Sequence, residues 1–248
     1  MSGTLLPIRL FVESPLKASA VIELGLADSH YIANVMRANA GDEILLFNGL
    51  DGEWQANLEI LGKKKTICRA TKQTRPQVKE PDLWFVFAPI KKARLDFVAQ
   101  KATELGVSKI LPVKTERTII SRVKGARLHA NAKEAAEQCE RLTIPVIEEF
   151  QSLKSLLAKW PNGRKLLFCD EEKGDLIVDQ ALKGNDVKPA RHPWGVLIGP
   201  EGGFSDLERQ LIRSQPFCVP ASLGPRVLRA DTAGMAALTL WQAALGDW

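Results

Sequence analysis

The pattern of the sequence changes once, at residues 73–82, and this change constrains the fold more than any other feature. Pro76 and Pro81 stand there among polar and charged residues, and neither a helical nor a strand period continues through them. Short apolar runs with turn residues precede this segment, whereas strands alternate with amphipathic helices after it. We therefore predict a domain boundary here, with one domain in residues 1–75 and a second in residues 76–248.

The first predicted domain is built from short strands. Apolar runs at residues 8–12, 43–47, 53–61 and 66–71 are separated by turn residues such as Gly49 and Gly52, which supply the positive φ of tight hairpins. A helix is predicted only at residues 27–38, with Asp28 or Ser29 as its N-cap. This pattern favours a small β-barrel.

The second predicted domain belongs to the α/β class. Buried strands are predicted at residues 84–88, 110–113, 165–169 and 195–198, with helical stretches between them. In the first of these helices, Leu95, Val98, Ala102 and Leu105 recur on one face, and Gly106 ends the helix. Alternation of this kind predicts a largely parallel sheet with helices on both faces.

Composition and cysteine spacing exclude several classes of protein. Hydrophobic residues make up 45% of the 248 residues and charged residues 25%, which is typical of a folded globular chain. The four cysteines include no C-x-x-C pair, so neither a zinc ribbon nor a thioredoxin motif is indicated, and no metal is expected. No apolar run approaches the length of a membrane span, and no signal peptide is evident. We expect a cytoplasmic protein with reduced thiols that does not enter membranes.

The positive charge of the chain is concentrated in one segment. Residues 76–130 carry 11 basic and 5 acidic side chains, whereas the net charge of the whole chain is only +5. The basic residues include Lys91, Lys92, Arg94, Lys101, Lys109, Lys114, Arg117, Arg122, Lys124 and Arg127. Two interpretations are equally open: solvated helix faces, or a surface that binds the phosphates of a nucleic acid.

A glycine-rich loop follows the strand that ends at Ile198. Gly199, Gly202 and Gly203 remove side chains from this loop, so that its backbone can approach a ligand closely. Ser205 and Glu208 then form the capping box of a new helix. The spacing matches neither a phosphate-binding P-loop nor the dinucleotide fingerprint, and a structural tight turn is the alternative.

A second strand, from Cys218, ends at Gly224-Pro225 before a terminal helix for which Asp231 or Thr232 is the expected N-cap. This helix has almost no charged face, and it must therefore be covered by the sheet or by another subunit. Both glycine-bearing loops should lie at the carboxyl edge of the parallel sheet, where folds of this type bind ligands.

These loops and two further motifs resemble one known family. The loops are Gly199-Pro-Glu-Gly-Gly-Phe-Ser205 and Leu223-Gly-Pro-Arg-Val-Leu-Arg-Ala-Asp-Thr-Ala233, and the other motifs are Lys101-Ala-Thr-Glu-Leu-Gly-Val107 and Glu134-Ala-Ala-Glu-Gln-Cys139-Glu-Arg141. Together they closely resemble the bacterial 16S ribosomal RNA uridine N3-methyltransferase family of the trefoil-knotted SPOUT superfamily. The chain departs from the family at Asp231, where Glu is more frequent.

The resemblance implies a fold, a cofactor and partners. The implied fold is a PUA-like RNA-binding β-barrel followed by a knotted parallel-sheet methyltransferase domain. The implied methyl donor is S-adenosylmethionine, and the implied partners are 16S ribosomal RNA in the small ribosomal subunit and a second copy of the chain. The residues implied to bind the methyl donor are Leu197, Gly199, Glu201, Gly202, Gly203, Leu223, Gly224, Val227 and Leu228.

The chemistry of this reaction suggests roles for three charged residues. Methylation of uracil N3 removes a proton and leaves negative charge on O2 and O4, which Arg229, or less favourably Arg226, is suited to stabilise. The alternative for these arginines is contact with a phosphate or an ion pair with Asp231. Glu201 is suited to neutralise the sulfonium charge or to accept hydrogen bonds from the methyl donor, and bracing the loop is the alternative.

Two other functions stay open at this point. A ribose 2′-O-methyltransferase of the same superfamily would use a different nucleophile, and a non-catalytic ribosome-assembly factor would need no methyl donor. His30, His129 and His192 are isolated in sequence, so a hydrolase mechanism has little support. Glu137 and Gln138 lie on a helix flank and are assigned either to a substrate or dimer contact or to solvent.

Overall fold

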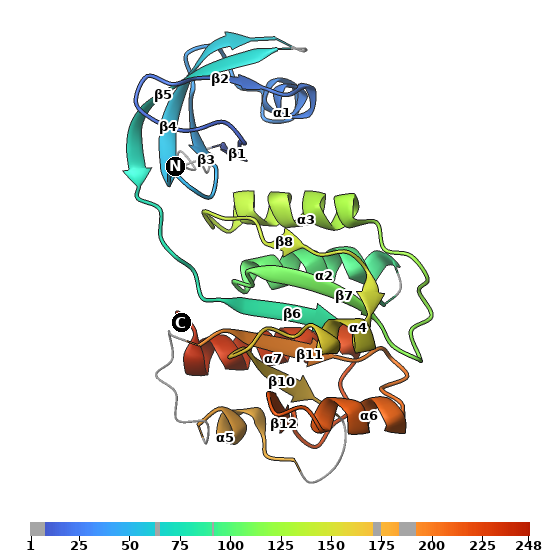
Figure 1. Ribbon diagram of the computed structural model, residues 1–248. Coiled ribbons are helices and arrows are strands. Elements are labelled where there is room, and N and C mark those ends of the chain that lie inside the picture. Colours follow the sequence, from blue (N-terminus) through green and yellow to red (C-terminus); the bar gives the residue numbers. More distant parts are fainter. Residues whose placement is uncertain (1–7, 63–64, 91, 171–174, 184–191) are drawn as a thin grey trace. The chain divides into compact units, whose positions relative to one another are not determined.

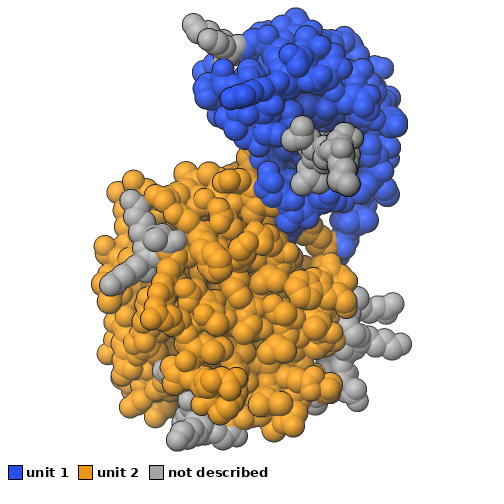
Figure 2. Space-filling model, turned by 180° about the vertical axis from the view of Figure 1, so that it is seen from behind, with its two compact units in different colours: residues 1–79, 136–144 blue, residues 80–135, 145–248 orange. Residues whose placement is uncertain are grey.

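The computed structural model describes residues 8–62, 65–90, 92–170, 175–183 and 192–248. The chain forms two compact units, which Figure 2 colours separately. Unit 1 comprises Met1–Lys79 and Ala136–Ile144, and unit 2 comprises Glu80–Ala135 and Pro145–Trp248. The units differ from the predicted domains in two places: unit 1 ends four residues later, and it includes residues 136–144 from the second predicted domain.

Unit 1 contains a five-stranded sheet in the order β1-β3-β4-β5-β2 (Figure 1). The strands are β1 (Arg9–Phe11), β2 (Val21–Leu24), β3 (Glu43–Phe47), β4 (Glu53–Leu61) and β5 (Thr66–Arg75). β1 pairs with β3 in parallel, and the other pairs are antiparallel. The predicted helix at residues 27–38 is confirmed in part, as α1 (Leu26–His30) followed by a π-helical turn, η1 (Tyr31–Val35).

Residues 136–144 are held to the sheet of unit 1 by a buried arginine. The side chain of Arg9 is 5% exposed, and its Nε donates to Glu53 while Nη1 donates to the carbonyl of Ala136, both at 2.6 Å. The carbonyl of Ala136 lies in the last turn of a helix, where no intrahelical partner is available, so Arg9 satisfies it. Burial opposes the charge of Glu53, but hydrogen bonds from Arg75, Arg9 and Thr74 lower the pKa of this carboxyl.

Glu137 also has a place in unit 1. Its Oε1 accepts a hydrogen bond of 3.0 Å from the backbone N–H of Phe11. This contact joins the same helix end to strand β1. From the sequence, Glu137 is assigned to a substrate or dimer contact or to solvent. The structure instead shows a contact of its side chain within unit 1.

Unit 2 is built on a parallel sheet with the strand order β12-β10-β11-β6-β7-β8, and β9 also pairs with β7. The strands are β6 (Leu83–Phe87), β7 (Lys109–Lys114), β8 (Val146–Ile147), β9 (Gln151–Ser152), β10 (Lys165–Cys169), β11 (Trp194–Ile198) and β12 (Cys218–Ala221). All of these pairs are parallel, as the alternation of strands and helices predicted. The trefoil knot stays a prediction.

Helices cover both faces of this sheet (Figure 1). The helices are α2 (Lys92–Glu104), α3 (Gly125–Gln138), α4 (Leu153–Ala158), α5 (Val178–Lys183), α6 (Asp206–Arg213) and α7 (Ala230–Leu245). One core contains Val196 and Ile198 of β11 together with residues of α2, α5 and α7, whereas Leu197 packs in the other core with α4 and α6. Alternate residues of a strand point to opposite faces, so both faces of β11 are apolar.

The apolar helix α7 is covered as predicted. Ala237, Leu238 and Trp241 are buried in the core that α7 shares with α2, α5 and the sheet. No helix in the part of the chain that the structure describes combines the length and apolar character that crossing a membrane requires.

Candidate functional site

A cavity of about 750 Å³ lies where strands β10, β11 and β12 end. It is lined by Cys169, Asp170, Ile177, Ile198, Gly199, Pro200, Glu201, Gly203, Phe204, Ser222, Leu223, Gly224, Pro225, Arg226, Val227, Leu228, Arg229, Ala230 and Ala233. The two loops predicted to meet at the carboxyl edge of the sheet therefore share one cavity. Its volume is within the usual range for small-molecule sites, roughly 300–1,000 Å³.

The first loop, residues 199–203, is called the glycine loop here. It is a tight turn in which the N–H of Gly203 donates to the carbonyl of Pro200 at 2.9 Å. Gly203 has a φ of +67°, which most side chains disfavour. Ser205 and Glu208 then form the predicted capping box of α6, which anchors the end of the loop. The predicted cap is thereby confirmed.

Glu201 lies at the centre of this turn, and its side chain is exposed at the rim of the cavity. Among the residues that the structure describes, none forms an ion pair or hydrogen bond with its carboxylate. Glu201 therefore does not brace the loop in this structure. Its charge is available to a ligand.

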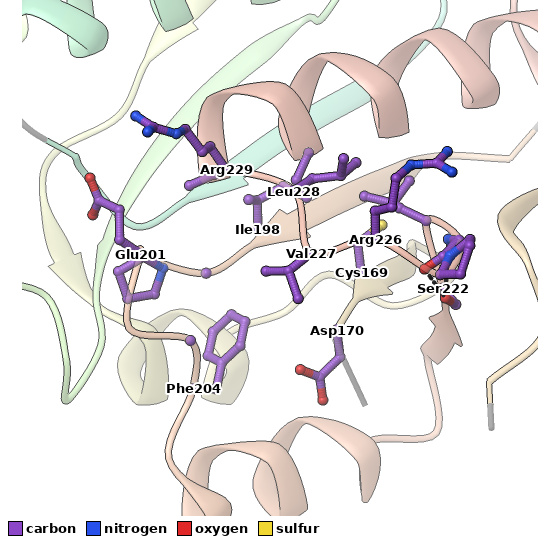
Figure 3. Close-up of a pocket in the computed structure, with 18 of the residues that line it drawn as sticks. Cys169, Asp170, Ile198, Glu201, Phe204, Ser222, Arg226, Val227, Leu228 and Arg229 are labelled. Carbon is purple, nitrogen blue, oxygen red and sulfur yellow. Dashed lines mark hydrogen bonds between the residues drawn. The ribbon is translucent and has the colours of Figure 1, made fainter. Parts of the chain in front are cut away.

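The second loop, residues 222–229, is called the arginine loop. The N–H of Gly224 donates to the hydroxyl of Ser222 at 3.2 Å, and Gly224 has a φ of +101°. Val227 is 82% exposed, and Figure 3 shows it near the middle of the cavity lining. Covering such an exposed apolar side chain with a ligand removes apolar surface from water, which favours binding of the ligand.

The two arginines of this loop are exposed, and no described residue forms an ion pair with either of them. In Figure 3, Arg229 lies toward one end of the cavity lining and Arg226 toward the other. Asp231, which was the alternative partner of these arginines, instead forms an ion pair with Arg94 of α2 at 3.4 Å. Both arginines are therefore free to contact a ligand or an RNA.

The predicted N-cap of α7 is wrong. Arg229 takes the N-cap position with extended backbone, and its side chain makes no capping hydrogen bond. Asp231 lies within the first helical turn, where its negative charge is favourable near the helix N-terminus. The helix begins at Ala230, and the ion pair with Arg94 joins Asp231 to α2.

A third wall of the cavity was not predicted. It is formed by Cys169 and Asp170 at the end of β10, where Asp170 accepts a hydrogen bond from Arg209 of α6 at 3.0 Å. Burial, together with the charge of Asp170, raises the pKa of the Cys169 thiol to about 12. Since β10 was predicted correctly, the end of this strand could also have been named as part of the site, because ligands bind at the carboxyl ends of parallel strands.

Two of the predicted methyl-donor residues are not in the lining of the cavity. The side chain of Leu197 is fully buried in the core beside α4 and α6, and Ile198 lines the cavity in its place. A shift of one residue along a strand exchanges its two faces. Gly202 belongs to the glycine loop, but it faces Arg117 outside the cavity.

The basic segment of residues 76–130 divides into paired and unpaired cations. Arg94, Lys101, Lys109 and Arg127 form ion pairs with Asp231, Glu104, Glu148 and Asp96. Lys114, Arg122 and Lys124 are exposed and have no ion-pair partner among the described residues. Lys91 lies outside the described residues. The two interpretations of this segment are not separated by these contacts, and binding of phosphates by its exposed cations stays a prediction.

No cluster of histidine, cysteine and acidic side chains suited to a metal ion occurs in the described ranges. The cavity is lined by two loops that carry apolar side chains and charges of both signs, at the edge of the sheet where α/β folds bind ligands.

Comparison with known proteins defines the class of protein. Residues 78–242 match the model of the RNA methyltransferase domain, and residues 25–70 match that of the RNA methyltransferase PUA domain. The first match covers most of unit 2, including both loops of the cavity. The fold and the site are those of an RNA methyltransferase with a PUA-like domain.

Individual relatives narrow the class. The chain is 33% identical to ribosomal RNA small subunit methyltransferase E of Rickettsia conorii over 93% of each chain, and 30% identical to the Bacillus subtilis protein of the same name over 85% of each. It belongs to the family of ribosomal RNA small subunit methyltransferase E.

Solved structures agree. A Neisseria gonorrhoeae ribosomal RNA small subunit methyltransferase E, bound to S-adenosylmethionine, has a TM-score of 0.86 and 26% identity, covering 98% of this chain and 100% of that one. A putative methyltransferase of Legionella pneumophila, in complex with the same cofactor, has a TM-score of 0.84 and 30% identity, covering 98% of this chain and 100% of that one.

Proposed function

We propose that the protein transfers a methyl group from S-adenosylmethionine to N3 of a specific uridine in 16S ribosomal RNA of the small ribosomal subunit. Family membership supports ribosomal RNA methylation, and the solved relatives support S-adenosylmethionine as the methyl donor. The observation that carries the proposal is the cavity itself, since Glu201, Arg226 and Arg229 all line it and none has an ion-pair partner among the described residues.

The residues of the cavity fit this methyl donor. Ile198, Val227 and Leu228 supply apolar surface for its adenine ring. S-adenosylmethionine has a sulfonium, an ammonium and a carboxylate, and the lining offers charges of both signs. We assign the negative charge of Glu201 to the positive groups of the methyl donor.

When bound, S-adenosylmethionine supplies an electrophilic methyl group, and the protein must hold the uracil nitrogen in line with it. Loss of the N3 proton leaves negative charge on O2 and O4 of the uracil. A guanidinium placed beside these oxygens stabilises the charge as it forms. We assign this role to Arg229 and place Arg226 at the base or at a neighbouring phosphate.

The rest of the chain is proposed to hold the RNA. The PUA-like domain, predicted at residues 1–75, and the exposed cations Lys114, Arg122 and Lys124 would contact phosphates without reading sequence. Small ribosomal subunits are the expected partner, and the cytoplasm is the expected location of the reaction.

We also propose that two copies of the chain pack through the methyltransferase domain, which is proposed to be knotted. The outer face of α7 is free of charge and only partly covered, along Thr232, Met235, Ala236, Thr239 and Leu240. Leu240 is 39% exposed. Light scattering after size exclusion should therefore give the mass of two chains, and Leu240→Glu should shift the protein toward one. A wild-type mass of one chain would contradict the dimer.

The proposal is tested with labelled S-adenosylmethionine, the purified protein, and either free 16S RNA or small subunits that lack the modification. Nucleoside mass spectrometry should find the label on N3 of uridine. Label on a ribose 2′ oxygen would favour the rival methyltransferase reaction. Absence of both transfer and methyl-donor binding would favour a non-catalytic assembly factor.

A further inference from the structure

A short turn at the end of β7 packs against the glycine loop from outside the cavity. The turn consists of residues 115–118, and its shape is fixed by two threonines: the N–H of Thr115 donates to Oγ1 of Thr118 at 2.9 Å, and their hydroxyls are 2.7 Å apart. We call it the threonine turn. Its backbone is joined to α6, since the N–H of Glu116 donates to Glu208 at 2.8 Å.

Arg117 of the threonine turn contacts the glycine loop directly. Its Nη1 donates to the carbonyl of Gly202 at 2.8 Å. A Cβ at Gly202 would lie 3.5 Å from Cβ and Cδ of Arg117, so the stem of the arginine also lies against this glycine. Neither residue lines the cavity, whereas Pro200, Glu201 and Gly203 do.

The peptide between Gly202 and Gly203 is consequently held on both sides. Its carbonyl accepts from Arg117, and its N–H donates to the carbonyl of Pro200 at 2.9 Å. This peptide sets the exit of the turn that carries Glu201 into the cavity lining. Arg117 is therefore placed to fix the orientation of the glycine loop without touching a ligand in the cavity.

The guanidinium of Arg117 has further hydrogen-bonding capacity. The side chain is exposed, and its hydrogen bond to Gly202 is its only polar contact with described residues. The remaining N–H donors form a planar fork that matches a phosphate. Lys114, Arg122 and Lys124, which flank the turn in sequence, are exposed and unpaired among the described residues.

We propose that Arg117 bridges a phosphate of the substrate RNA to the Gly202 carbonyl, so that RNA and methyl donor bind cooperatively. This inference rests on the proposed function, because it needs both ligands. An arginine clamped between a phosphate and the carbonyl loses its freedom when RNA binds, and the glycine loop is then already ordered when the methyl donor arrives. Linkage requires the effect to be reciprocal.

The test measures binding and not turnover. Equilibrium dialysis of the full chain with labelled S-adenosylhomocysteine, which has no methyl group to transfer, gives its dissociation constant without RNA and with saturating small subunits or free 16S RNA. We expect RNA to tighten binding by about fivefold or more in the wild type. The ratio of the dissociation constants without and with RNA is called the RNA factor. In Arg117→Met this factor should fall to about one, and Arg117→Lys, which keeps the positive charge but not the planar fork of donors, should give an intermediate value.

Arg122→Met is the matched control. Arg122 lies in the same basic segment but has no contact with the glycine loop among the described residues, so this variant should bind RNA more weakly and keep the full factor once RNA is saturating. Thermal unfolding of each variant checks that the fold is intact. If Arg117→Met is unstable, the intermediate factor of Arg117→Lys decides the question.

Two results would overturn the proposal: a wild-type factor of one, or an Arg117→Met variant that keeps the wild-type factor. An Arg117→Met variant that binds S-adenosylhomocysteine weakly without RNA yet keeps the factor would show a structural brace alone. A wild type that binds no S-adenosylhomocysteine under any condition would contradict the proposed function itself.

Discussion

The two edges of the parallel sheet in unit 2 carry similar residue types in opposite states. At the amino edge, where the strands begin, Arg164 is 5% exposed and donates to Asp82 at 2.6 Å and to the carbonyl of Trp194 at 2.8 Å. Its guanidinium also lies 3.6 Å from the ring centre of Trp84. At the carboxyl edge, Arg226 and Arg229 are exposed and have no ion-pair partner among the described residues.

The buried arginine stabilises the fold, whereas the exposed arginines are available to ligands. The guanidinium of Arg164 contacts the ring of Trp84 and the carbonyls of Asp82 and Trp194, so it holds the starts of β6, β10 and β11 together. The two arginines of the carboxyl edge are exposed side chains of the arginine loop. A cation that the fold does not need is a candidate for binding.

The largest effect is expected at the carboxyl edge. Arg229→Met should lower the methylation rate at saturating methyl donor and RNA by about 100-fold or more, because the negative charge on the uracil oxygens would lose its stabilising partner. Arg226→Met, a matched change in the same loop, should have a smaller effect. Single-turnover kinetics measure both. An unchanged rate for Arg229→Met would remove the proposed role.

The same substitution at the amino edge should affect stability. Arg164→Met removes buried hydrogen bonds and a cation–π contact, and it should lower the free energy of unfolding by about 2–4 kcal/mol. Arg226→Met should change it by less than about 0.5 kcal/mol, since an exposed, unpaired side chain contributes little. Urea titration of each variant tests the contrast, and equal losses for both would break it.

A smaller effect is expected at the exposed valine of the cavity. Val227→Ala removes apolar surface that the methyl donor would cover, and it should raise the dissociation constant of S-adenosylmethionine by about threefold to tenfold. Calorimetry measures the change. Leu207→Ala is the control, because Leu207 is 75% exposed and does not line the cavity. Equal affinities in the wild type and Val227→Ala would place the methyl donor away from this residue.

The smallest effect is expected at Cys169. Burial first, and then the nearby charge of Asp170, raises the pKa of this thiol to about 12, so the folded protein keeps it protonated at neutral and mildly alkaline pH. Since the pKa is raised above the ordinary thiol value of 9.0, titration of this thiol lowers the stability of the folded protein only between that value and a pH of about 12. Cys169→Ala should therefore leave the rate within about twofold and the pH–rate profile unchanged between neutral and mildly alkaline pH. A lost inflection in this range would show that the thiolate takes part.

The sequence predicted those parts of the fold that local patterns determine. The strands at residues 43–47, 53–61 and 165–169 match β3, β4 and β10, because apolar runs between turn residues define them. Gly106 ends the predicted helix with a φ of +77°. β2 (Val21–Leu24) was missed because it is only four residues long and its exposed residue Val21 is apolar, which obscures the alternation of exposed and buried positions.

Tertiary contacts explain the remaining differences. Two contacts join segments that are far apart in the chain: the ion pair of Asp231 with Arg94, and the hydrogen bond from Arg9 to the carbonyl of Ala136. Local sequence patterns do not predict such contacts. The cavity was predicted from its two glycine-bearing loops, whereas its wall at Cys169 and Asp170 depends on β10 lying between β11 and β12. Strand order of this kind is a property of the fold.

We propose that the carboxyl edge of the sheet holds the methyl donor between the glycine loop and the arginine loop. A crystal structure of the protein with S-adenosylmethionine tests it most directly. We predict the cofactor in the cavity beside Val227, with its sulfonium facing the end of the cavity at which Glu201 and Arg229 lie. Density for the cofactor at any other place on the molecule, with this cavity closed by side chains, would contradict the account.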